Sequence, residues 1–108
     1  MIALANTTAI LLNHPDGTVR FVEYDGKLDT LRQLLGVDLV DAMLLDTKHI
    51  MFYDDEMCDK PYRIGFEIHF RGITALIKGS ALITGDDAGE NAPLKIKNNE
   101  LKINVIKL

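Results

Sequence analysis

The stretch from Thr18 to Gly36 constrains the fold most. Apolar and polar residues alternate over 18–24, the turn-forming pair Asp25-Gly26 follows, and Leu then stands at positions 28, 31, 34 and 35. Alternation with period two predicts a strand, whereas the Leu spacing predicts a short helix over 28–35 with one apolar stripe. Gly36 stands where a left-handed residue commonly ends a helix. A helix this short is not stable alone, so its stripe must pack on neighbouring strands.

Strand patterns recur along the rest of the chain. Residues 7–12 are apolar and β-branched, and the turn His14-Pro-Asp-Gly17 joins them to 18–24 as an antiparallel hairpin. Further short strands are predicted at 40–45, 50–53, 73–77 and 81–84. The pattern indicates an α+β fold, mainly an antiparallel sheet of about five or six short strands with one or two short helices on one face. With 108 residues the chain is predicted to form a single domain, 1–108, which begins with a loose lead-in over 1–6.

The segment 61–70 allows two interpretations. Ile64, Phe66, Ile68 and Phe70 alternate with more polar residues, which is typical of a strand. Pro61 at a first helical turn, together with the four-residue spacing of Ile64 and Ile68, would suit a helix instead. Both remain open at this stage.

The C-terminal part is basic and is predicted to form a hairpin over 94–108. Two Lys-rich segments, 94–97 and 100–107, flank Asn98-Asn99, a pair that tolerates positive φ, so Lys97 would lie opposite Glu100. This part carries a net charge of +3, while the whole chain carries −4. The asymmetry would allow a homodimer in which the tail of one copy meets an acidic surface of the other.

The overall charge and composition argue against several classes of function. A net charge of −4 is unlike the basic footprint of nucleic-acid-binding proteins. One Cys and three scattered His do not predict a metal site, no cofactor motif is present, and no apolar run approaches a membrane span. The acidic groups at 54–59 and 86–90 lack the alternating ligands of a calcium loop and are predicted to be solvated. The expected location is the cytoplasm, with no membrane partner.

One face carries a suggestive set of side chains. If 61–70 is a strand, Arg63, Glu67 and His69 share a face that Arg71 continues. Arg forms bidentate contacts with anions, so Arg63, His69 and Arg71 are the candidate ligand-binding residues for a small anionic molecule. No nucleophile–base pattern is present. Residues 78–80, Lys-Gly-Ser, have the wrong order for a phosphate loop, so no catalytic residue is assigned and the chain is not expected to be an enzyme.

Three segments resemble one family. They are Asp25 to Gly36 with its preceding strand, Ile77 to Asp87 followed by Gly89-Glu90, and Ile50 to Glu56 between them. Across about 7–92 the chain is similar to the small phage and mobile-element proteins of domain-of-unknown-function family thirty-eight forty-six. The resemblance implies an origin in a phage or integrated element, and it implies no catalytic residues. It also implies a helix near 61–70, although the Asn that follows the Pro of that family's segment is missing from Pro61-Tyr-Arg63, and the basic tail differs as well.

Together these observations predict a phage or mobile-element accessory protein in the host cytoplasm. It would be a non-enzymatic binder of a host protein or of a small anionic ligand, with an anti-defence role. A small enzyme acting on a nucleotide-like substrate through Arg63, His69 and Arg71 is the first alternative. A nucleic-acid modulator working through the basic tail is the second.

Overall fold

The computed structural model describes residues 6–97 and 99–108. Within these residues it contains nine strands, one α-helix and one short 3-10 helix. In chain order they are β1 (Thr7–Asn13), β2 (Thr18–Tyr24), α1 (Leu28–Leu35), β3 (Val40–Leu44), β4 (His49–Asp54), η1 (Met57–Asp59), β5 (Ile64–Phe70), β6 (Ile73–Lys78), β7 (Ala81–Asp87), β8 (Glu90–Ala92) and β9 (Leu101–Lys107).

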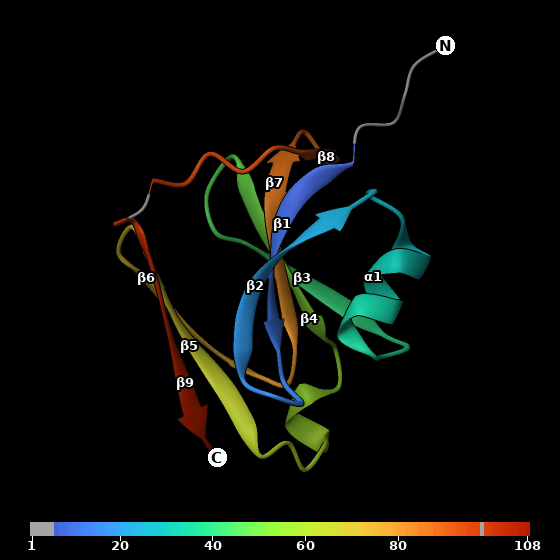
Figure 1. Cartoon of the computed structure of the whole chain (residues 1–108), viewed down its shortest axis with the longest axis vertical. Coiled ribbons are helices and arrows are strands. Elements are labelled where there is room, and N and C mark those ends of the chain that lie inside the picture. The colour runs from blue at the N-terminus through green and yellow to red at the C-terminus, as the bar shows by residue number, and fades with distance from the viewer. Residues whose placement is uncertain (1–5, 98) are drawn as a thin grey trace.

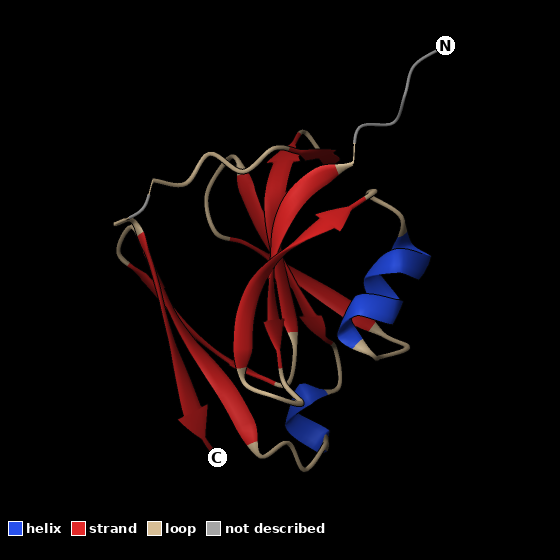
Figure 2. Cartoon of the chain, viewed as in Figure 1, coloured by secondary structure: helices blue, strands red, loops and turns tan. Residues whose placement is uncertain are grey.

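The strands form two antiparallel sheets. Sheet A has the order β2-β1-β7-β4-β3, with β8 pairing to the end of β7, and sheet B has the order β6-β5-β9. Figures 1 and 2 show three layers, with sheet B on one face of sheet A and α1 on the other. The predicted α+β class with a mainly antiparallel sheet is confirmed. The division of the strands between two sheets was not predicted.

The stretch 18–36 folds as its pattern indicates. β1 and β2 form a hairpin in the register Thr7↔Tyr24 to Asn13↔Thr18. The helix α1 spans the predicted residues and ends at Gly36, which is left-handed with φ 67° and ψ 34°. Leu31 and Leu35 are buried and pack with the apolar residues of β1 and β7 that face the helix.

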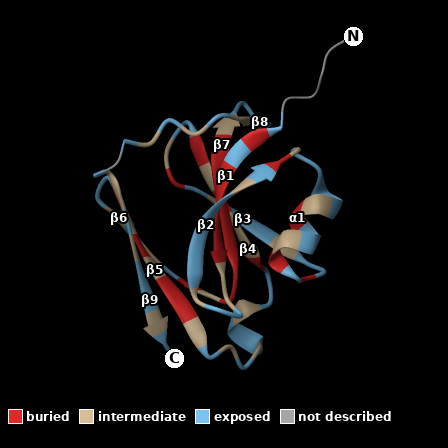
Figure 3. Cartoon of the chain, viewed as in Figure 1, coloured by how far each residue is buried: buried red, intermediate tan, exposed pale blue. Residues whose placement is uncertain are grey.

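Two strands lie at the centre of the molecule and are covered on both faces. In β1, Ala9 and Leu11 pack toward α1, while Ile10 and Leu12 pack toward sheet B. In β7, residues 81–85 are all buried, which places this strand at the centre of the core (Figure 3). Strands covered on both sides consist of continuous apolar runs, which explains why 9–12 and 81–83 show no alternation.

Residues 64–70 form the strand β5, so the strand interpretation of this segment is confirmed. Phe66, Ile68 and Phe70 have no exposed surface, because they face sheet A across the core. Glu67 and His69 lie between them on the outer face and are half-buried. The alternative of a helix here, which the family resemblance also implied, is wrong. The apolar side chains at alternate positions of β5 form one row that packs on sheet A.

The predicted basic hairpin over 94–108 is not formed. Residues 94–97 belong to no strand, and β9 pairs instead with β5, from Ile64↔Lys107 to Phe70↔Leu101. Leu94 and Ile96 pack against the core, because this segment carries the chain across from sheet A to sheet B. The predicted contact between residues 97 and 100 is present, since the Glu100 amide donates to the Lys97 carbonyl at 3.0 Å. Asn98, one of the two predicted turn residues, lies outside the described residues, as does the predicted lead-in apart from Asn6.

Candidate functional site

The predicted ligand face is only partly assembled. His69 and Arg71 border one surface depression of about 220 Å³, together with Thr74, Glu100 and Lys102. Arg63 precedes the other end of β5, is exposed, and does not border this depression. Both ring nitrogens of His69 have partners, with Nε2 2.7 Å from Glu67 Oε1 and Nδ1 3.2 Å from Thr74 Oγ1.

Arg71 already holds two carboxylates. Its Nε and Nη2 donate to the two oxygens of Glu100 at 2.6 and 3.0 Å, and its Nη1 donates to Asp46 Oδ2 at 2.5 Å. The hydrogen bond from Arg71 is the main reason why the pKa of Glu100 falls to about 2. An anionic ligand at this position would have to displace a carboxylate. The arrangement therefore suits a structural clamp that ties the β5–β6 and β3–β4 turns to the start of β9 better than it suits a ligand site.

The same clamp extends into the core through His49, which has no exposed surface. His49 Nδ1 lies 2.9 Å from Asp46 Oδ1, and the amide of Lys95 donates to His49 Nε2 at 2.9 Å. Because Nε2 accepts, the ring proton is on Nδ1 and donates to Asp46. Burial raises the pKa of Asp46, but hydrogen bonds from the Lys48 amide and His49 lower it more.

His49 is the first residue of β4, one position before the strand predicted from the sequence at 50–53. It lies on the same inward face of β4 as Met51, a signal that extending the predicted strand by one residue would have revealed. An Asp–His pair can serve catalysis, but this imidazole is enclosed and already bonded at both nitrogens. Its Nε2 instead accepts the amide hydrogen of Lys95 and so fixes the backbone at that residue.

The acidic loop also contains a buried residue that the sequence interpretation missed. Asp54 has no exposed surface, although the group 54–59 was expected to be solvated. Its carboxylate accepts hydrogen bonds from Tyr62 Oη at 2.5 Å and from the Glu56 amide at 2.9 Å, and it pairs with Lys60 Nζ at 2.9 Å. These partners compensate for burial of the charge and fix the chain before β5.

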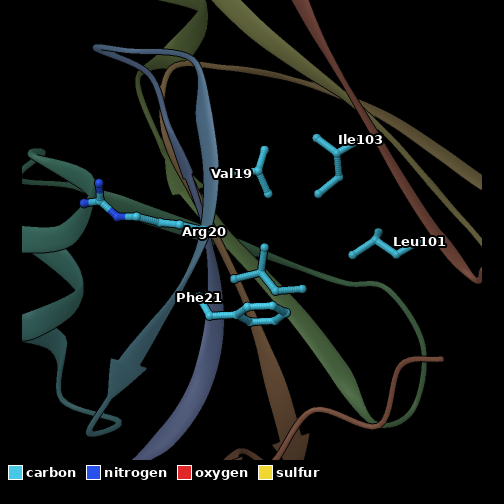
Figure 4. A pocket seen from close by; sticks show the side chains of 6 residues that line it. Val19, Arg20, Phe21, Leu101 and Ile103 are labelled. Carbon is cyan, nitrogen blue, oxygen red and sulfur yellow. The ribbon is translucent and has the colours of Figure 1, made fainter. Parts of the chain in front are cut away.

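A groove lies between β2 and β9. It contains a cavity of about 310 Å³ lined by Ile10, Val19, Phe21, Leu101 and Ile103, together with Arg20. Figure 4 shows the side chains of Val19, Phe21, Leu101 and Ile103 directed into the same space, with Arg20 directed away from it. Phe21 is 73% exposed and Val19 is 43% exposed, unusually large values for neighbouring apolar residues on one strand face.

A second cavity extends this groove. It has a volume of about 220 Å³, shares Ile10, Phe21 and Leu101 with the first, and adds Leu94, Ile96 and Lys97. We call the combined feature, lined by all of these residues, the β2–β9 groove. The alternation of β2 had placed Val19 and Phe21 on one face, but it could not show that this face is left uncovered.

Two other kinds of feature are absent from the described residues: a metal-binding cluster and a membrane-spanning helix. Among residues 6–97 and 99–108, no group of three His, Cys, Asp or Glu side chains is arranged to hold a metal ion. In the same part of the chain, no helix has the length and apolar character needed to cross a membrane.

No protein-family model, no curated protein and no solved structure matches this chain. The resemblance to family thirty-eight forty-six therefore stays a prediction from the residues.

Proposed function

We propose that this chain is a non-enzymatic accessory protein that binds a partner protein through the β2–β9 groove. The observation that carries the proposal is the exposure of Phe21 and Val19 beside the partly exposed apolar residues of β9. Exposed apolar grooves of this kind are characteristic of interaction surfaces, and an aromatic anchor commonly dominates their binding energy. A small anionic ligand at His69 and Arg71 is less well supported, because Arg71 already binds Glu100 and Asp46.

The sequence resemblance to phage and mobile-element proteins supports a host protein as the partner. In this proposal the protein acts in the host cytoplasm and blunts a host defence. The absence of a catalytic pattern from the sequence supports a role through binding rather than turnover.

The test compares three immobilised proteins in a bacterial lysate: wild type, Phe21→Asp and Leu44→Asp. Leu44 is 60% exposed on β3, at the opposite edge of sheet A, so it is a matched control for placing a charge at an exposed apolar position. We expect a partner that the wild type and Leu44→Asp retain and that Phe21→Asp binds about 30-fold more weakly, the size of an interface hot spot. Equal retention by Phe21→Asp and the wild type would show that the groove is not the binding surface.

A further inference from the structure

Sheet B has three strands and leaves part of the inner face of sheet A uncovered at β2. On β5, the inward residues Phe66 and Ile68 have no exposed surface, whereas Val105 on β9, which pairs with Phe66, is 49% exposed. Beyond β9 the inward face of β2 is still apolar, and Phe21 there is 73% exposed. The apolar inner layer therefore continues past the last strand of sheet B.

The outer edge of β9 is available for pairing in the described structure. Among residues 6–97 and 99–108, no strand pairs with β9 other than β5. Neighbouring strands lie about 4.8 Å apart, and packed sheets lie about 10 Å apart. Because Leu101 and Ile103 of β9 and Phe21 of β2 point into the same groove, the inward side chains of a strand added beyond β9 would face that groove as well.

We propose that an extended segment of the partner protein fills this position as a fourth strand of sheet B. The inference rests on the function proposed above and specifies the mode of binding and the chemistry of the partner. Main-chain hydrogen bonds to β9 would supply affinity, and alternate side chains in the groove would supply specificity, as in other cases of strand addition.

The charges on β9 and beside it define the other face of that segment. The outward face of β9 carries Lys102, together with the uncharged Asn104 and Ile106. The nearby acids, Glu67 and Glu100, already have partners in His69 and Arg71. Opposite charges stabilise cross-strand pairs. The segment that fits therefore has apolar residues directed inward at alternate positions, with an Asp or Glu opposite Lys102 on its outward face.

The width of sheet A disfavours a second copy of this chain as the occupant. Two copies joined through β9 would form one continuous sheet B, with both copies of sheet A beneath it. The β2 strand of each copy would then project under the partner's β9, where Ile10 of β1 already lines the space. A single strand meets no such obstruction.

A phage-displayed library of random decapeptides tests the inference. Selection uses the wild type, and counter-selection uses Phe21→Asp. We expect enriched sequences with apolar residues at alternate positions and an acidic residue among the positions between them. In the complex with such a peptide, alternate β9 amides should exchange hydrogen at least about ten-fold more slowly than in the free protein. Methylation of the peptide nitrogens that face β9 should weaken binding by a similar factor.

Charge reversal supplies a matched control. Lys102→Glu should weaken binding of the acidic peptide and strengthen binding of a version in which Lys replaces its acidic residues. Lys27→Glu, which changes an exposed Lys next to α1, should do neither. The absence of an enriched peptide would overturn the inference.

Two further outcomes would also overturn the inference. A bound peptide that leaves the β9 amides unprotected would indicate docking through side chains alone, and concentration-dependent protection without peptide would identify a second copy as the occupant. The lysate experiment with Phe21→Asp reports separately on the proposed function, which would survive the first of these results.

Discussion

Replacing Tyr62 with Phe removes a single hydroxyl group, and that group donates to the buried carboxylate of Asp54 at 2.5 Å. A hydrogen bond to a charged group contributes about 1.5–3 kcal/mol. Lys60 and the Glu56 amide would still contact Asp54, so the charge would keep part of its compensation. We therefore expect Tyr62→Phe to lower the free energy of unfolding by about 2 kcal/mol at pH 7.

The stability difference between wild type and Tyr62→Phe should also depend on pH in a definite direction. Burial raises the pKa of Asp54, but hydrogen bonds from Tyr62 and Lys60 lower it more, so it lies below its ordinary value of 3.8. A depressed pKa contributes stability that is present above the unfolded-state value and is lost as pH falls through the folded-state value. The difference between wild type and variant should therefore shrink below about pH 4, toward the roughly 1 kcal/mol of a neutral hydrogen bond.

Urea unfolding at pH 7 and pH 3 measures both quantities, and Tyr53→Phe is the matched control. Tyr53 Oη lies 3.3 Å from Asp41 Oδ2, and Asp41 is exposed, so this substitution should cost no more than about 0.5 kcal/mol. If both variants lost the same stability at pH 7, or if the difference for Tyr62→Phe grew in acid, the reasoning would be refuted.

Two further predictions concern a glycine and an ion pair. Gly79 has φ +84°, and a Cβ there would lie 2.7 Å from the Tyr62 ring, so Gly79→Ala should cost about 3 kcal/mol in urea unfolding. Gly72→Ala, at φ +85° with open space, should cost about 1 kcal/mol, and equal losses would contradict the close contact. An NMR titration should find the Glu100 pKa near 2, and Arg71→Ala should move it up toward about 4.3, with faster exchange of the Glu100 amide. An unchanged midpoint would mean that Arg71 does not hold this carboxylate.

The elements that local chemistry controls were predicted closely. The bounds of α1 and its termination at Gly36 agree with the structure because the Leu spacing and a left-handed residue act within a few positions of one another. The β1–β2 hairpin was predicted for the same reason, since its turn residues lie between the two strands. Alternation in 64–70 also favoured the strand that is present.

The candidate site was predicted poorly because its parts are distant in sequence. Arg71 was chosen as an anion ligand, but its carboxylate partners Asp46 and Glu100 lie 25 and 29 residues away. His49 and Asp54 each stand between an apolar run and a polar turn, and their buried partners are distant in sequence: Lys95 for His49 and Tyr62 for Asp54.

The sequence by itself determined most of the elements and which side chains share a face within them, because hydrogen-bonding geometry and residue spacing are local properties. Val19 and Phe21 were on one face of their strand from the outset. Only the tertiary structure decided that this face is uncovered, because coverage depends on which strands pair across the fold. β9 pairs with β5 rather than with 94–97, and sheet B ends there, which leaves the β2–β9 groove open.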